Sequence, residues 1–361
     1  RTGGNPHRPG GHAAKTVVKL NLADDLLHND AGGKTEMKRM NKLFAAFSLF
    51  FLITPSQALE LPGPLVESGW LADNFGQVVI LDVRKDVDSF TSQASMRKDK
   101  KTGQLSIVSV GGHIEGARLV NYKKVRATRS VDGKDVTRML PAQADFESLM
   151  QQLGLSNDSA VLIVSKGMSG ADLTMAARLY WQLKYFGHDR VAILNGGMAQ
   201  WLLDGRKVVR AASDPAKGDW RATATRKEML ASSADVAAAV ENGNVQLIDN
   251  RPLSAYMGTW KTSYVYDKGH IPGAKPFPNE LMASVSVPAK FPSADALRQL
   301  YTGMQLDAAA DSITYCNSGQ LAAGGWFIQH ELLGNGKTRL YDGSMHQWTL
   351  EKRPVKAMVL E

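Results

Sequence analysis

The chain contains three short sequence patterns that each occur twice in the same order. The first copies read VVILDVR, GHIEGA and NGGMAQW, and the second copies read VQLIDNR, GHIPGA and DGSMHQW. They occupy residues 78–84, 112–117 and 195–201, and again residues 245–251, 269–274 and 342–348. A repeat this long is typical of a duplicated domain rather than of a solenoid of short units. The length of 361 residues also predicts two domains, because it exceeds what one hydrophobic core usually holds.

Short apolar stretches alternate with helix-like segments in each half of the chain. The expected strands occupy residues 78–81, 161–164 and 191–194, and then residues 245–248, 313–315 and 338–341. The expected helices span residues 173–186 and 321–333, and a glycine follows each of them. This alternation predicts an α/β fold with two tandem domains, each a parallel sheet flanked by helices.

A polar segment rich in breaker residues, residues 211–219, predicts the boundary between the two domains. We therefore expect one domain over residues 59–212 and a second over residues 213–361. Residues 91–104 contain three lysines and a glycine but few apolar side chains. They are expected to form an exposed insertion of the first domain.

The N-terminal part has the pattern of a secretory signal peptide at residues 37–58. A short cationic stretch precedes an apolar run over residues 43–53, and the small residues Ser56 and Ala58 follow. The run has 11 residues, whereas about 20 are needed to cross a bilayer. A buried amphipathic helix is disfavoured because the phenylalanines of the run leave no polar face. We expect cleavage after Ala58 and export to the periplasm, and we interpret residues 1–36 as non-native or over-extended.

The charge balance is mildly basic once the first 58 residues are set aside. The whole chain has a net charge of +8, of which residues 1–58 contribute eight basic and four acidic side chains. The remaining excess is diffuse, and no basic stripe with interleaved aromatic residues is present. A nucleic-acid partner is therefore not expected, nor is a membrane partner after signal cleavage. A small anionic ligand is compatible with the charge.

Cys316 is the only cysteine, so an intramolecular disulfide and a C-x-x-C oxidoreductase are excluded. It follows the expected strand 313–315 and precedes the expected helix 321–333. Ligands collect where strands of a parallel sheet turn into helices, and the N–H groups and dipole there stabilise a thiolate. A lone cysteine after an apolar strand can also be an inert, buried small residue. The sequence thus indicates a candidate reactive thiol.

The repeated patterns, together with the loop at Cys316, resemble the two-domain rhodanese family over about residues 65–350. The resemblance implies two tandem rhodanese-like domains of which only the second is catalytic, and residues 165–170 of the first half indeed contain no cysteine. It implies a sulfurtransferase of the thiosulfate or mercaptopyruvate type. In this chemistry the Cys316 thiolate takes the outer sulfur of a donor such as thiosulfate, and sulfite leaves. The Cys316 persulfide then passes its sulfur to cyanide, a thiol or a protein acceptor.

The resemblance also assigns residues to the site. Besides the nucleophile Cys316, it implies substrate binding by Asn317, Ser318, Gly319, Gln320, Leu321, Asp249 and Arg251. An internal ion pair that holds the strand end is an equally good interpretation of Asp249 and Arg251. The histidines in the two GHI patterns are interpreted as packed turn residues, and no metal or cofactor is expected.

This chain departs from the family pattern in charge. Thiosulfate-type members usually carry Arg and Lys directly after the cysteine, where this chain has Asn317 and Ser318. Many also have an arginine at the place of Ala255. The small, uncharged loop is closer to the mercaptopyruvate type, so that donor stays an alternative to thiosulfate. Lys261 or Lys268 could supply the missing cation.

Two other functional classes, a phosphatase and a non-catalytic binding protein, fit the sequence less well. A phosphatase with the same fold needs an arginine to clamp phosphate at the position of Ala322, so this function is disfavoured. A non-catalytic binding protein is compatible with the uncharged loop, but the retention of Cys316 argues against it. Loading of sulfur onto Cys316 would distinguish these hypotheses.

Overall fold

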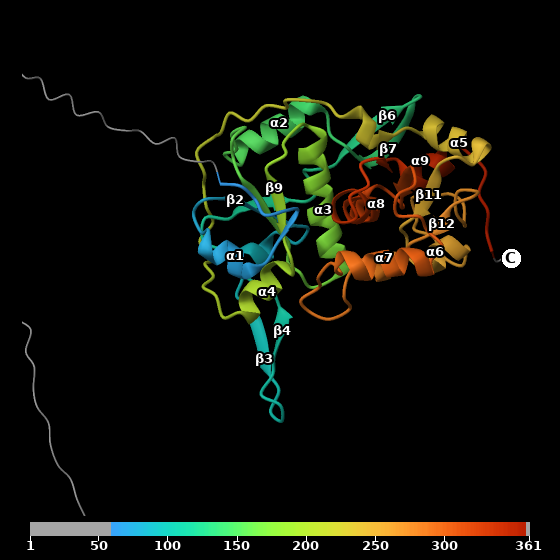
Figure 1. The fold of residues 1–361 in the computed structure, drawn as a ribbon. Coiled ribbons are helices and arrows are strands. Elements are labelled where there is room, and N and C mark those ends of the chain that lie inside the picture. Colours follow the sequence, from blue (N-terminus) through green and yellow to red (C-terminus); the bar gives the residue numbers. More distant parts are fainter. Residues whose placement is uncertain (1–58, 359–361) are drawn as a thin grey trace, which may run out of the picture. The chain divides into compact units, whose positions relative to one another are not determined.

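The computed structural model describes residues 59–358, so the expected signal peptide at residues 37–58 and the segment before it lie outside the described residues. Two parallel five-stranded sheets form the framework (Figure 1). Their central strands are apolar runs buried on both faces, as parallel strands covered by helices must be. The predicted α/β fold with a parallel sheet in each half is confirmed.

The first sheet has the strand order β1-β9-β8-β2-β5. Its strands are β1 (Leu65–Val66), β2 (Val79–Arg84), β5 (Arg118–Asn121), β8 (Val161–Val164) and β9 (Val191–Leu194). In its centre Ile80 pairs with Leu162, and Leu162 pairs with Ala192. The three strands predicted in this half are therefore neighbours.

The second sheet repeats the first strand for strand, in the order β10-β14-β13-β11-β12. Its strands are β10 (Leu230–Ala231), β11 (Gln246–Asp249), β12 (Lys275–Pro276), β13 (Ser312–Tyr315) and β14 (Thr338–Tyr341). Leu247 pairs with Ile313, and Thr314 pairs with Leu340. Equal strand order in the two halves shows that the sequence repeat is a repeat of structure.

Helices cover both sheets, and none of those described is long and apolar enough to cross a membrane. The α-helices are α1 (Ser68–Asp73), α2 (Gln143–Gln152), α3 (Gly170–Tyr185), α4 (Gly197–Leu203), α5 (Ser233–Asn242), α6 (Leu253–Met257), α7 (Ala294–Gly303), α8 (Gln320–Trp326) and α9 (Ser344–Leu350). The helix expected over 321–333 is α8 continued by a π-helical turn, Phe327–Leu332.

Helices α3 and α8 join the two halves along the middle of the molecule (Figure 1). Gly324 of α8 faces Thr174 of α3, and a β-carbon at Gly324 would overlap the Thr174 side chain. One hydrophobic core includes residues from both sheets and both helices, among them Leu179 and Ala323. The halves are thus packed into each other.

Two segments extend the contact between the halves. The hairpin formed by β6 (Ala127–Val131) and β7 (Lys134–Met139) reaches the second half, where Lys134 Nζ donates to the Leu350 carbonyl. In return, Trp220 is fully buried against the first half, and its indole N–H donates to His188 Nδ1. The boundary predicted after residue 212 stays a prediction, and chain beyond it packs on the first half.

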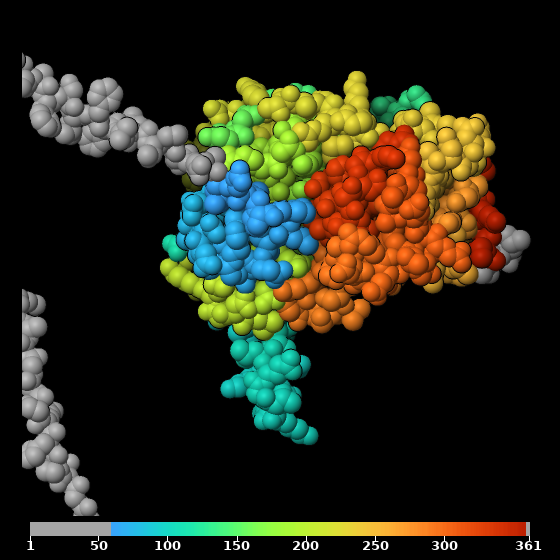
Figure 2. Space-filling view, in the orientation of Figure 1, coloured from blue at the N-terminus to red at the C-terminus, as the bar shows by residue number. Residues whose placement is uncertain are grey.

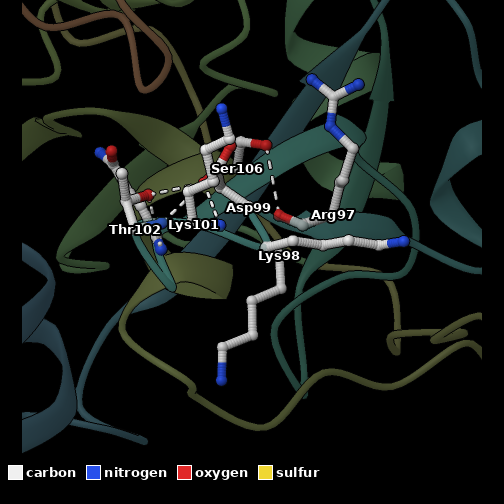
Figure 3. A pocket seen from close by; sticks show the side chains of 8 residues that line it. Arg97, Lys98, Asp99, Lys101, Thr102 and Ser106 are labelled. Carbon is white, nitrogen blue, oxygen red and sulfur yellow. Dashed lines mark hydrogen bonds between the residues drawn. The ribbon is translucent and has the colours of Figure 1, made fainter.

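A second hairpin, β3 (Ser95–Lys98) and β4 (Leu105–Ser109), projects from the first half (Figures 1 and 2). Most of its side chains are exposed, as expected for the insertion at residues 91–104. At its tip the Asp99 carboxylate accepts hydrogen bonds from the backbone N–H groups of Lys101 and Thr102 (Figure 3). Asp99 therefore closes the turn, while the lysine side chains around it extend outward.

Candidate active site around Cys316

An identical ion pair holds the end of the second strand of each repeat. In the second half, Arg251 donates to both carboxylate oxygens of Asp249 and to the Gly269 carbonyl, at 2.6–3.1 Å. In the first half, Arg84 pairs with Asp82 and donates to the Gly112 carbonyl at 2.7 Å. All four charged side chains are buried. The structure thus engages Asp249 and Arg251 with each other, and their assignment to substrate binding stays a prediction.

The two GHI patterns form packed turns. His270 Nδ1 lies 2.8 Å from the Tyr256 carbonyl, and its ring stacks on Tyr256. His113 makes the same pair of contacts with Phe90. Burial lowers the pKa of His270, so its ring is neutral near pH 7. Among the described residues, no cluster of three or more His, Cys, Asp or Glu side chains could hold a metal ion.

Cys316 lies directly after β13 and is almost completely buried, with 2% of its surface exposed. Its backbone N–H and that of Gly319 both donate to the Ser344 hydroxyl, at 3.0 and 3.3 Å. The Cys316 and Asn317 carbonyls accept hydrogen bonds from the N–H groups of Met345 and His346. The start of α9 therefore holds the loop that follows the cysteine.

The first half has the same loop with a serine in place of the cysteine. The Ser165 carbonyl accepts from Met198 N–H at 2.8 Å, and the Lys166 carbonyl accepts from Ala199 N–H at 3.0 Å. These bonds match those of Cys316 and Asn317, so Ser165 is the structural equivalent of Cys316. The first half keeps the shape of the loop and lacks its thiol.

A cation from the first half reaches the loop of the second half. Arg178 of α3 is fully buried, and its Nη1 atom lies 2.5 Å from Asp342 Oδ1 and 3.4 Å from the Gly319 carbonyl. The other oxygen of the Asp342 carboxylate accepts the backbone N–H of Leu140 at 2.5 Å. Asp342 thus ties both halves to the turn between β14 and α9.

The Arg178 guanidinium is incompletely paired. Its Nε and Nη2 atoms are buried and have no hydrogen-bond partner. Burial by itself would lower the pKa of Arg178, but the charge of Asp342 and its hydrogen bond to the guanidinium outweigh burial and raise that pKa. Arg178 is therefore a permanent cation within the electrostatic reach of Cys316. Unpaired buried N–H groups of this kind are ready to bind an anion.

Gly319 permits this close approach. Its φ of +80° lies in the left-handed region that glycine adopts without strain. A β-carbon at this position would overlap Asp342 Oδ1 and Arg178 Nη1. The glycine is thus required both by the backbone and by the interhalf ion pair.

The other predicted loop residues have different surroundings. The Asn317 amide oxygen is buried without a partner, and Ser318 Oγ lies 3.4 Å from Tyr264 Oη. Gln320 donates to the Ala171 carbonyl of α3 at 3.2 Å, and Leu321 is partly buried against the shared core. The structure thus brings the predicted loop residues together at the seam between the halves, without testing their roles in binding.

Lys261 Nζ donates to the Val265 carbonyl four residues along, and the role of Lys261 or Lys268 as the cation of the loop stays a prediction. Sequence reasoning missed Arg178, which stands 138 positions before Cys316 inside a helix. It also assigned no role to Ser344, although this residue lies within the repeated pattern DGSMHQW. The strained φ of Ser344, +50°, accompanies the placement of its hydroxyl under the loop.

Two cavities flank the loop. The larger, of about 700 Å³, is lined by Tyr264 and His346, which contact Ser318 and Asn317. The smaller, of about 460 Å³, is lined by Gln320 and by residues of the first half. Lys85 and Lys123 line both cavities. Cationic cavities between the halves therefore lie beside the Cys316 loop, and Gln320 is the loop residue that lines one of them.

Comparisons with known proteins agree with the repeat. The rhodanese-like domain family matches residues 67–204 and 232–351. The chain is 27% identical to thiosulfate sulfurtransferase of Cricetulus griseus over 292 residues, which covers 80% of this chain and 93% of that protein. It is 30% identical to sulfur carrier protein TtuD of Thermus thermophilus over 247 residues, covering 66% and 82%.

Among solved structures, the fold is similar to that of SseA from Escherichia coli, one of the 3-mercaptopyruvate sulfotransferases. The TM-score is 0.61 at 26% sequence identity, and the match covers 78% of this chain and 98% of SseA. The loop at Cys316 and the equivalent loop at Ser165 both lie inside the two segments that match the rhodanese-like domain family.

Proposed function

Because this chain belongs to the rhodanese family, we propose that it is a sulfurtransferase in which Cys316 carries the transferred sulfur, with thiosulfate as the donor. In the first step the Cys316 thiolate attacks the outer sulfur of thiosulfate. The sulfur–sulfur bond of the donor breaks, sulfite leaves with the electron pair, and a Cys316 persulfide remains. A thiol or cyanide then attacks the outer sulfur of the persulfide, and the Cys316 thiolate is restored.

The observation that carries this proposal is the incompletely paired Arg178 guanidinium beside the loop. A dianionic donor brings negative charge into a buried site next to a thiolate, which is costly unless a cation is present. Arg178 supplies that cation together with free N–H donors. The Ser344 hydroxyl fixes the loop that holds the nucleophile, so the loop does not need to rearrange as charge develops.

Mercaptopyruvate is the second candidate donor, and one observation favours it. The loop side chains directly after Cys316 are the uncharged Asn317 and Ser318, and the chain is similar to a 3-mercaptopyruvate sulfotransferase. A carboxylate donor carries a single negative charge, which Arg178 alone can balance. The two donors lead to the same Cys316 persulfide and leave different products, sulfite and pyruvate.

The test is to record the intact mass of the protein after incubation with thiosulfate or with mercaptopyruvate. A gain of about 32 mass units, one sulfur atom, is expected in the wild type and is absent in Cys316→Ser. The donor that loads the protein faster is the better substrate. If neither donor adds sulfur to well-folded protein, the sulfurtransferase proposal is wrong and a binding function becomes the better explanation.

The proposed site of action is the periplasm, on the evidence of residues 37–58 alone. The expected mature protein begins near Leu59. Mass measurement of the protein recovered from the periplasmic fraction of a bacterial host tests this. A protein that is retained in the cytoplasm with residues 37–58 attached would contradict export.

A further inference from the structure

The larger of the two cavities beside the loop is built from both halves of the molecule. Its first-half side comes from the chain around Lys85 and Lys123 and from the β6–β7 hairpin, and its second-half side comes from Tyr264, Tyr266 and His346. At its inner end Tyr264 Oη lies 3.4 Å from Ser318 Oγ, and the His346 backbone N–H donates to the Asn317 carbonyl. The cavity thus adjoins the two residues that follow Cys316.

Four cations line this cavity, and one carboxylate, Asp135, accompanies them. The cations are Lys85, Lys123, Arg126 and Arg138. Within residues 59–358, none of the four forms an ion pair, whereas Arg84, Arg178 and Arg251 each do. An uncompensated group of like charges is destabilising unless a ligand or counterions balance it.

Arg126 shows this imbalance most clearly. Its Nε atom is buried and has no hydrogen-bond partner, and its guanidinium lies over the Tyr122 ring at 4.3 Å. Burial lowers the pKa of Arg126, and the neighbouring cations Arg178 and Arg138 lower it further. A bound anion beside the guanidinium would oppose both effects, because its negative charge would stabilise the charged form of Arg126 and reduce the repulsion.

The cavity also has an apolar wall. The Arg138 guanidinium lies 4.0 Å from the centre of the Tyr264 ring, and the His346 ring packs edge-on against the same tyrosine. Burial lowers the pKa of His346, with Arg138 adding to the effect, so this ring is neutral near pH 7. A ligand in this cavity therefore meets flat, uncharged rings as well as cations, which suits a molecule with a short carbon chain.

The volume of the cavity indicates the size of ligand that would fill it. About 700 Å³ lies in the range typical of small-molecule sites, of about 300–1,000 Å³. Cyanide and thiosulfate would leave most of this volume to water. The four cations and Asp135 leave a net charge of +3, which a ligand with more than one negative group would balance better than a monoanion, and each carboxylate can bind a guanidinium through two hydrogen bonds.

We propose that this cavity binds the sulfur acceptor, and that the acceptor is a small thiol carrying two or more carboxylates. The proposal rests on the sulfurtransferase function proposed above. The acceptor thiol loses its proton to solvent, and its thiolate attacks the outer sulfur of the Cys316 persulfide. The persulfide S–S bond breaks, its electron pair returns to the Cys316 sulfur, and the acceptor leaves as a persulfide. Atoms and charge are conserved without any further reactant.

The experiment measures the rate at which a preloaded Cys316 persulfide is discharged in a single turnover. The probes are mercaptosuccinate, thioglycolate and 2-mercaptoethanol, which carry two, one and no carboxylates. Each rate is compared between the wild type and Lys123→Gln/Arg138→Gln, because this ratio cancels the intrinsic reactivity of each thiol. We expect a loss of about tenfold with mercaptosuccinate, a smaller loss with thioglycolate and the smallest with 2-mercaptoethanol.

Lys98→Gln/Lys101→Gln is the matched control, because it removes the same charge at the tip of the β3–β4 hairpin, outside the cavity. It should change the three rates equally. If Lys123→Gln/Arg138→Gln does not load sulfur, the exposed Lys123→Gln carries the same comparison alone. Equal ratios for all three thiols would overturn the acceptor proposal while leaving the sulfurtransferase function intact. Failure of the wild type to load sulfur would instead reject that function.

Discussion

Gly319 is the residue on which the geometry next to Cys316 depends most directly. Its left-handed backbone places the carbonyl against Arg178 and leaves no room for a β-carbon beside Asp342. Two separate penalties therefore apply to a substitution: backbone strain of about 1–3 kcal/mol, and displacement of the ion pair. The second penalty affects the chemistry as well as stability.

Gly319→Ala is expected to lower the free energy of unfolding by more than the strain alone and to slow sulfur loading at least tenfold. Two alanine variants separate the causes. Gly273→Ala has a similar φ of +80° with open space around the β-carbon, and Gly336→Ala has open space and no left-handed φ. Urea unfolding and mass-detected loading measure both effects. Loading at the wild-type rate in Gly319→Ala would show that the ion pair is not needed for the reaction.

The Arg178–Asp342 pair can be assigned to structure or to chemistry by a double-mutant cycle. Arg178→Leu leaves the buried Asp342 carboxylate without its ionic partner, which typically costs about 3–5 kcal/mol. Adding Asp342→Asn removes that charge and should restore much of the stability. We expect sulfur loading from thiosulfate to stay at least tenfold slower in the double variant, because the cation is still missing. Recovery of loading together with stability would mean that Arg178 is only structural.

At the scale of secondary structure, the strands with buried apolar runs were predictable and the rest were not. β8, β9 and β14 occur at the predicted residues, because short runs of mostly buried side chains, four in β8 and β9 and three in β14, leave a clear pattern. The two-residue edge strands β1 and β10 leave none. The β6–β7 hairpin is polar in sequence and is placed by its contacts with the other half, so no local signal marks it.

Prediction of the site is limited in the same way, because residues that are placed by contacts with the other half have no local signal in the sequence. Cys316 and its loop were found because they follow a recognisable strand. Arg178 lies in the middle of α3 and looks in sequence like a helix-surface residue, whereas in the structure it is fully buried. Its role depends on a contact across 164 residues of chain. Long-range contacts of this kind have no periodicity that a sequence reveals.

The tip of the β3–β4 hairpin, residues 99–104, is expected to be dispensable for both stability and sulfur loading. All six of its residues are exposed, whereas Ile107 of β4 is part of the hydrophobic core. Replacing residues 99–104 by Asn-Gly, a tight hairpin turn between the paired residues Lys98 and Leu105, should change the unfolding midpoint by less than the error of the measurement. Loading from either donor should also be unchanged. A clear loss of loading would place part of the donor route on this hairpin.

At the scale of the whole molecule, one hydrophobic core and one set of buried polar contacts span both halves. Trp220 and the β6–β7 hairpin each cross the seam. Three buried histidines, His188, His270 and His346, are distributed over this common framework, and burial lowers the pKa of each. Their protonation is therefore linked to the stability of the complete unit.

Stability is expected to fall as the pH drops below about 6.5, the value of a histidine in an unfolded chain. Above that pH the histidines are neutral in both the folded and the unfolded protein. Below it the histidines of the unfolded chain bind protons that those of the folded protein do not, so acid favours unfolding. Urea unfolding at pH 7.5 and 5.5 measures the effect. His188→Gln, which can still accept the Trp220 N–H, should reduce the difference. An equal difference in wild type and variant would exclude His188 as a source.

The buried pair of Arg178 and Asp342 has a consequence for how the duplicated halves can vary. After a duplication, the copy that loses its thiol would ordinarily be free to drift, since its own chemistry is gone. Here that copy supplies the buried cation that pairs with Asp342 of the other copy, while its own loop carries Ser165. Each copy therefore contributes one member of an ion pair that joins the two. A change at position 178 or 342 alone leaves a buried charge without its ionic partner, so we expect the two positions to vary together.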